Sequence, residues 1–334
     1  MAARLAFGVV LLALIAPGAA AHEKWFVDAD AYPLQADGAG LRRVVLALAL
    51  ALLLVGAAAL ADRIWRGRAR PVTPESLAAS KADLDRLLSW IPVILGVHAA
   101  VPLVAAGAQR YLLAPNLELA WSFGGAAIGL AEIVIALAFL YGMLTRAAAV
   151  LLAVLFVVGA VIFGPVELAE QLHFLGIAFF LAIVGRGRYS FDRVLIVPRP
   201  GVRRLIPAAI PALRILTGLS IAWVGITEKL LNIPMGAAFL TRYPVNVLRG
   251  FGVADEAFVV LAGVIEVAIG LLIASGQLMR LVIAAAWVPF NLTLPLLGWK
   301  ELTGHLPIYG IMAVLLLWGN ARDVRGYVEQ MVRD

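Results

Sequence analysis

Two glutamates lie in the middle of long apolar stretches of this sequence, each in the same local pattern. Glu132 follows Gly129 in GLAEIVIALAF, and Glu266 follows Gly263 in GVIEVAIGLLI. A charged side chain at the centre of a bilayer costs on the order of a few kcal/mol, so it faces protein or a cavity and has a partner. Two interpretations stay open for each residue: a carboxyl group that exchanges protons or binds a headgroup, or a polar clamp between helices.

The spacing between the two glutamates recurs along the chain. They lie 134 residues apart, and further glycine, glutamate and arginine pairs keep this separation without a gap: Gly129/Gly263, Gly142/Gly276, Arg146/Arg280, Gly164/Gly298, Glu167/Glu301, Gly176/Gly310 and Gly185/Gly319. Shared leucines are expected by chance in an apolar chain, whereas these residue types are not. The pattern therefore predicts an internal duplication in which each copy keeps one intramembrane carboxylate.

The composition indicates a polytopic membrane protein. Of the 334 residues, 63% are hydrophobic and 14% are charged, whereas soluble domains have roughly 45–50% apolar and about 25% charged residues. The net charge of +6 comes from basic residues in short loops, which indicates topology and not nucleic-acid binding. The absence of cysteine excludes disulfides, thiolate metal sites, Cys-ligated iron–sulfur clusters and c-type haem attachment.

The glutamates must be positioned by membrane-spanning helices, each of about 20 apolar residues. The expected spans are 43–61, 88–107, 119–141, 147–164, 169–185, 209–228, 256–275, 281–298 and 305–319. The predicted fold class is therefore all-α: a polytopic transmembrane bundle of about nine helices after signal removal, with two four-helix repeats. Four spans separate each element from its counterpart, so the repeats are parallel and not inverted.

The N-terminus has the features of a secretory signal. Residues 1–21 combine Arg4, an apolar core and the small residues Ala19-Ala20-Ala21, so cleavage would leave His22 as the mature N-terminus. The remaining predicted segments are an external segment at 22–42, an extra transmembrane helix with a basic linker at 43–87, repeat one at 88–186, a cytoplasmic linker at 187–208, repeat two at 209–320 and a cytoplasmic tail at 321–334.

The distribution of basic residues predicts the orientation. With the mature N-terminus outside and the C-terminus cytoplasmic, the predicted cytoplasmic segments carry 17 Lys and Arg residues and the external segments carry 8. This bias follows the positive-inside rule. We therefore expect a multi-pass protein of a bacterial-type cytoplasmic (inner) membrane.

The predicted outer edge of repeat two carries further polar residues. Glu228 and Lys229 lie in GITEKL at the outer end of a span, where they could pair locally or meet Glu301. Repeat one lacks this Glu-Lys pair, so a single active site would lie in repeat two. The candidate catalytic residues are Glu132, Glu266, Glu228 and Lys229.

Three of the four histidines are predicted on the external side. A mature N-terminal His22 could bind copper or zinc through its amine and ring, together with His305 or His173, because imidazole suits both metals. No spaced metal motif is present, and histidines that serve as polar helix ends are the alternative. His98 is expected to be a buried, hydrogen-bonded histidine.

Repeat two resembles a DoxX-type four-helix membrane unit. The resemblance rests on the G-x-x-E-K-L segment Gly225–Leu230, the G-x-x-E helix around Glu266, the turn that ends at Arg280, and GHLPIYGIMAVLLLWG at 304–319. Repeat one is similar more weakly, through Gly129, Glu132, Arg146 and Gly176. The resemblance implies an integral membrane protein of the kind associated with thiosulfate:quinone oxidoreductase or with other redox and detoxification complexes.

Three functional hypotheses follow, and whether the chain is an enzyme stays open. The first is an accessory membrane subunit of a quinone-linked redox or detoxification system, with electrons supplied by a partner protein. The second is a lipid or small-solute binding or transport module that uses Glu132 and Glu266. The third is an external copper- or zinc-handling protein that uses His22.

Overall fold

The computed structural model describes residues 22–66, 81–194 and 202–319, and these residues form helices without any β-strand element. The expected all-α class is confirmed. The predicted signal at 1–21, the predicted tail at 321–334 and the central parts of the two predicted basic linkers lie outside the described residues.

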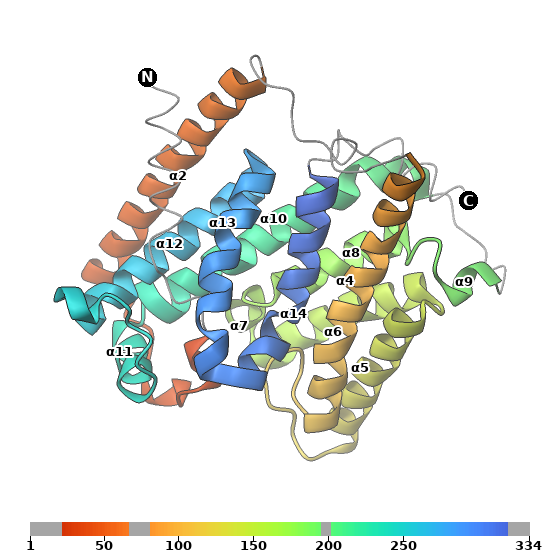
Figure 1. The fold of residues 1–334 in the computed structure, drawn as a ribbon. Helices are drawn as coiled ribbons and strands as arrows, with labels where there is room; N and C mark the ends of the chain where they lie inside the picture. Colours follow the sequence, from red (N-terminus) through yellow and green to blue (C-terminus); the bar gives the residue numbers. More distant parts are fainter. Residues whose placement is uncertain (1–21, 67–80, 195–201, 320–334) are drawn as a thin grey trace. The chain divides into compact units, whose positions relative to one another are not determined.

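Seven helices of the described chain are long and apolar enough to cross a membrane. They are α2 (Gly38–Arg66), α4 (Lys81–Gln109), α5 (Phe123–Tyr141), α6 (Thr145–Phe163), α10 (Ile206–Val224) with its continuation η4 (Gly225–Leu230), α12 (Asp255–Ser275) and α14 (Leu294–Trp318). Two shorter apolar helices are α8 (Leu172–Val184) and α13 (Met279–Leu292). Figure 1 shows these helices along the chain. The protein is thus a multi-pass membrane protein.

All nine expected spans fall on these helices, but the boundary near residue 293 was predicted wrongly. The expected span 281–298 divides: α13 ends at Leu292, and residues 294–298 belong to α14. The α14 backbone kinks at Gly298, whose φ of 65° is non-helical. The uncharged stretch 281–298 continues through the break at Thr293, which is why hydropathy alone did not locate it.

The remaining elements are short. They are η1 (Glu23–Trp25), η2 (Ala29–Ala31), α7 (Pro165–Ala169), α9 (Phe191–Val194), η3 (Val202–Leu205), α11 (Ile233–Arg242) and η5 (Arg249–Phe251). Among these, α11 and η5 lie in the connection between η4 and α12.

The chain divides into two compact units. In the described residues, the first unit comprises 22–66 and Gly218–Leu302, and the second comprises 81–194, 202–217 and 303–319. In the first unit α2 and η4 pack along α12; in the second, α4 packs on α5 and α6 packs on α8. The C-terminal half of α14 belongs to the second unit, where Gly310 faces His98. The compact units therefore cut across the second predicted repeat.

The 134-residue spacing recurs in the backbone. Left-handed or other positive-φ residues stand at the same separation in both copies: Gly142 (68°) and Gly276 (74°), Leu144 (54°) and Leu278 (47°), Gly164 (91°) and Gly298 (65°), Gly185 (70°) and Gly319 (60°). A leucine in this region is uncommon, because its Cβ crowds the following carbonyl. Its occurrence at Leu144 and at Leu278 agrees with a duplicated helix–turn–helix.

Candidate functional site

The best-formed polar site of the first unit begins with a change of helix type. Helix α10 continues into η4, a π-helix, and the Leu231 N–H donates to the Ile226 carbonyl, five residues earlier, over 2.8 Å. A π turn holds more residues than an α turn, and such turns are frequent at functional sites. The consecutive residues Glu228 and Lys229 are both buried here, with 0% and 1% of their surface exposed.

Two glycines allow η4 to approach α12 closely. A Cβ on Gly225 would lie 2.9 Å from the Glu266 Cβ and 3.0 Å from the Gly263 carbonyl oxygen. A Cβ on Gly263 would lie 2.9 Å from the Lys229 Cβ. The Gly-x-x-Glu pattern thus brings the backbone of η4 against the helical face that carries Glu266, and it places Lys229 beside that glutamate.

Lys229 lies between two carboxylates. Its Nζ is 3.0 Å from Oε2 of Glu23, which belongs to η1, and 3.2 Å from Oε1 of Glu266 on α12. All three side chains are at most 7% exposed. Charges removed from water are retained only when they are paired and hydrogen-bonded, and here one ammonium serves two carboxylates.

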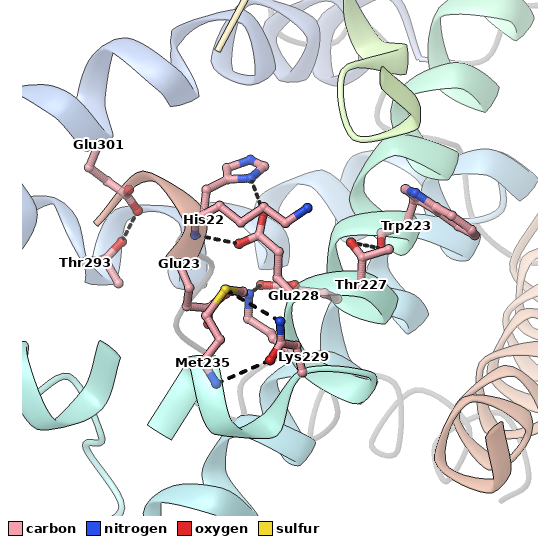
Figure 2. Close-up of polar contacts among 12 residues, drawn as sticks. His22, Glu23, Trp223, Thr227, Glu228, Lys229, Met235, Thr293 and Glu301 are labelled. Carbon is pink, nitrogen blue, oxygen red and sulfur yellow. Dashed lines mark hydrogen bonds and ion pairs between the residues drawn. The ribbon is translucent and has the colours of Figure 1, made fainter. Parts of the chain in front are cut away.

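Glu228 points to a different partner, as Figure 2 shows. Its Oε1 lies 3.1 Å from Nδ1 of His22, and its Oε2 accepts the backbone N–H of Lys24 at 3.4 Å. The His22 ring also stacks on Trp25, with centroids 4.1 Å apart. The four charged side chains and His22 form one site, which we call the Lys229 cluster: His22, Glu23, Glu228, Lys229 and Glu266.

The segment that supplies His22 and Glu23 is fixed to the helices of the first unit. The Asn232 side-chain amide donates to the Tyr32 carbonyl at 2.8 Å, and the Gln35 N–H donates to the Leu231 carbonyl at 2.6 Å. The Phe26 ring packs on Phe239 of α11, with centroids 5.9 Å apart. The N-terminal segment is therefore an integral part of this site, although it is distant in sequence.

The electrostatics of the cluster raise the pKa of Glu23. Burial raises the pKa of Glu23 well above its ordinary value of 4.5; Lys229 opposes this shift, and the carboxylates of Glu228 and Glu266 add to it. Desolvation disfavours the charged form, and one ammonium does not compensate for several nearby negative charges. Glu23 lies outside the membrane-spanning helices, and its raised pKa makes it the carboxyl group of this cluster best suited to proton exchange.

Glu132, the counterpart of Glu266, has a different environment in the second unit. It is fully buried, and its Oε1 accepts the backbone N–H of Leu113 at 2.8 Å. Leu113 has a φ of 63° in the segment that follows α4. A glycine contact precedes this glutamate too, because a Cβ on Gly129 would lie 2.8 Å from the Gly107 carbonyl oxygen. The first copy thus uses its glutamate to hold a loop, which supports the clamp interpretation for Glu132.

The other candidates have different hydrogen-bond partners or belong to the second unit. Glu301 is buried in the first unit and accepts a hydrogen bond from the Thr293 hydroxyl at 2.8 Å (Figure 2). His173 and His305 are buried in the second unit, whereas His22 belongs to the first. In the described residues no group of three or more His, Cys, Asp or Glu side chains is arranged to hold a metal ion. The copper or zinc site stays a prediction.

His98 is hydrogen-bonded as expected, since its Nδ1 lies 2.8 Å from the Ile94 carbonyl oxygen one turn earlier in α4, but its side chain is only partly buried. Sequence reasoning missed Glu23 as a partner of Lys229. The one signal in the sequence for this partner was that Glu23 and the GITEKL segment were both predicted on the external side.

No family model, no curated protein and no solved structure matches this chain.

Proposed function

We propose that this multi-pass membrane protein is a DoxX-like accessory subunit of a quinone-linked redox or detoxification system in a bacterial-type inner membrane. In this proposal the Lys229 cluster is the part of the chain that takes up and releases protons. The observation that carries it is the pair of carboxylates, Glu23 and Glu266, at 3.0 and 3.2 Å from one buried ammonium.

Proton handling follows from the charge balance of this arrangement. When both carboxylates are ionised, they exceed the charge of Lys229 by one in a site that water barely reaches. Gaining or losing one proton changes the net charge of Glu23, Lys229 and Glu266 between zero and −1. A change of charge at a neighbouring redox protein would bias this exchange electrostatically, since buried charges are screened less than exposed ones.

The cluster itself does not fit a quinone ring. Glu23, Glu228 and Lys229 are each less than 5% exposed, which leaves no opening at these side chains for a ring of that size. We therefore place the quinone and the electron carriers with a partner protein, and we derive no step through the quinone. Whether this chain performs any catalytic step depends on that partner.

The experiment is purification of the full-length protein from its native membrane in mild detergent. We expect a redox protein to copurify and the complex to bind a quinone analogue. Infrared difference spectra taken across pH should show a protonated-carboxyl band that is lost in Glu23→Gln but kept in Glu132→Gln. If no redox protein copurifies and no analogue binds, the accessory role is wrong; if the band is unchanged in Glu23→Gln, the proton-exchange role is wrong.

A further inference from the structure

A pocket of about 270 Å³ lies in the second unit, where α5 ends and α6 begins. Its lining combines one buried cation with aromatic and aliphatic side chains: Leu140, Tyr141, Arg186, Tyr189, Ser190, Phe191 and Val194. We call it the Arg186 pocket. It belongs to the second unit, whereas the Lys229 cluster belongs to the first, and the proposed function does not use it.

Backbone geometry fixes the segment that forms one wall. Helix α5 ends at Gly142, whose φ is 68° and where a Cβ would lie 2.8 Å from the Arg186 Cδ. The Asp192 N–H donates to the Gly142 carbonyl at 2.9 Å. The Asp192 carboxylate accepts the backbone N–H groups of Leu144 and Thr145, the latter at 3.0 Å. The one acidic group of this segment is therefore engaged by the start of α6.

Arg186 is a buried cation with donor capacity left over. Only 9% of its surface is exposed, and Nη1 donates to the Tyr189 carbonyl at 3.0 Å. Its Nε is buried without a hydrogen-bond partner in the described structure. Burial lowers the pKa of Arg186, but a guanidinium stays protonated in proteins. A buried donor without a partner costs about 1–3 kcal/mol.

Apart from Ser190, the rest of the lining is aromatic or aliphatic, and much of it is accessible. Tyr141, Phe191 and Val194 are more than half exposed, and the Tyr189 ring stacks on Trp90 with centroids 4.7 Å apart. The pocket adjoins the ends of two candidate spans, Phe123–Tyr141 and Thr145–Phe163. Aromatic side chains at such positions favour the level of lipid headgroups.

We propose that the Arg186 pocket binds the anionic headgroup of a phospholipid. A guanidinium matches a phosphate in charge and in planar donor geometry. The apolar lining suits the glycerol and the first acyl carbons, which a free phosphate lacks. Arg188 and Arg193 add positive charge to the same segment. The basic-residue bias predicts this end of the spans to be cytoplasmic, where basic pockets beside transmembrane helices bind anionic lipids.

The test measures lipid retained by full-length protein after exchange into nanodiscs of phosphatidylcholine with or without phosphatidylglycerol. We expect the parent protein to enrich phosphatidylglycerol, and Arg186→Met to reduce this enrichment about tenfold, since hydrogen bonds to charged groups contribute roughly that much. The matched control is Arg193→Met, which removes an exposed charge of the same segment that does not line the pocket. It should stay within about twofold of the parent.

A second variant guards against misfolding of Arg186→Met. Val194 is 74% exposed, so Val194→Asp should fold normally while placing a negative charge at the pocket. We expect it to reduce phosphatidylglycerol enrichment severalfold. Unchanged enrichment in Val194→Asp, or in a natively helical Arg186→Met, would overturn the proposal. So would an equal loss in Arg193→Met, which would indicate diffuse surface charge, or displacement of the lipid by millimolar inorganic phosphate, which would indicate a soluble ligand.

Discussion

Replacing Lys229 by methionine should destabilise the first unit strongly. The ammonium lies 3.0 Å from Glu23 and 3.2 Å from Glu266, and each contact supplies on the order of 5 kcal/mol of Coulomb attraction at an effective dielectric constant of about 20. Desolvation offsets much of this attraction, but removing one partner leaves uncompensated buried charge. Breaking such a pair costs about 3–5 kcal/mol, which is the loss we expect for Lys229→Met.

The assay is reversible unfolding in mixed micelles, followed by far-ultraviolet circular dichroism. A triple variant, Lys229→Met with Glu23→Gln and Glu266→Gln, carries no charge at these positions and should recover at least half of the loss. Glu132→Gln serves as the matched control in the other copy. Its amide oxygen can still accept the Leu113 N–H, so it should stay within about 1 kcal/mol of the parent.

Two results would refute this reasoning. A Lys229→Met protein within about 1 kcal/mol of the parent would mean that the cluster does not stabilise the fold. A triple variant as unstable as the single one would mean that the loss comes from packing of the lysine stem and not from unpaired charge.

Three further predictions concern the same unit. Gly263→Ala should lower stability by about 1–3 kcal/mol in thermal unfolding, because its Cβ would crowd Lys229 and Gly225, whereas Gly250→Ala, with nothing within 4 Å, should not; equal effects would contradict the close-approach argument. The raised pKa of Glu23 contributes stability that is fully present below pH 4.5, its ordinary pKa, and is lost as the pH rises through the raised pKa. The melting temperature of Glu23→Gln should therefore rise relative to that of the parent over this pH range. A difference in melting temperature that does not change with pH would show that this pKa is not raised. Intact mass of the protein from membranes should correspond to a chain that begins at His22, and a mass that retains residues 1–21 would show that the signal is not cleaved.

Periodicity and residue spacing were sufficient to predict the helices. Long apolar runs marked the spans, since a bilayer imposes a minimum length, and the 134-residue spacing predicted turns that recur at Gly142 and Gly276. The cost of a charge at the centre of a bilayer also correctly indicated that Glu132 and Glu266 face protein, because both are buried. The helix break at Thr293 escaped prediction, since no charged residue interrupts the sequence on either side of it.

The partners of the site residues could not be predicted from spacing. Lys229 was expected to pair with Glu228 or Glu301, but the structure adds Glu23, which is 206 residues away, and Glu266 on α12. Pairing at that separation depends on how the N-terminal segment folds back onto α11 and η4. The different roles of Glu132 and Glu266 also depend on the groups that meet them: a backbone N–H from the loop after α4 in one copy, and the Lys229 ammonium from η4 in the other.

The position of Glu23 has a consequence for biosynthesis. This carboxylate is made near the start of translation, but Lys229 and Glu266 emerge only after most of the helices have been synthesised. If the N-terminal segment is exported early, as the signal predicts, Glu23 remains solvent-exposed outside the membrane until η4 and α12 enter the bilayer. The last step in assembling the first unit would then be binding of the N-terminal segment to η4 and α12. A chain in which this segment is still accessible to proteases would be one whose later helices have not yet been inserted.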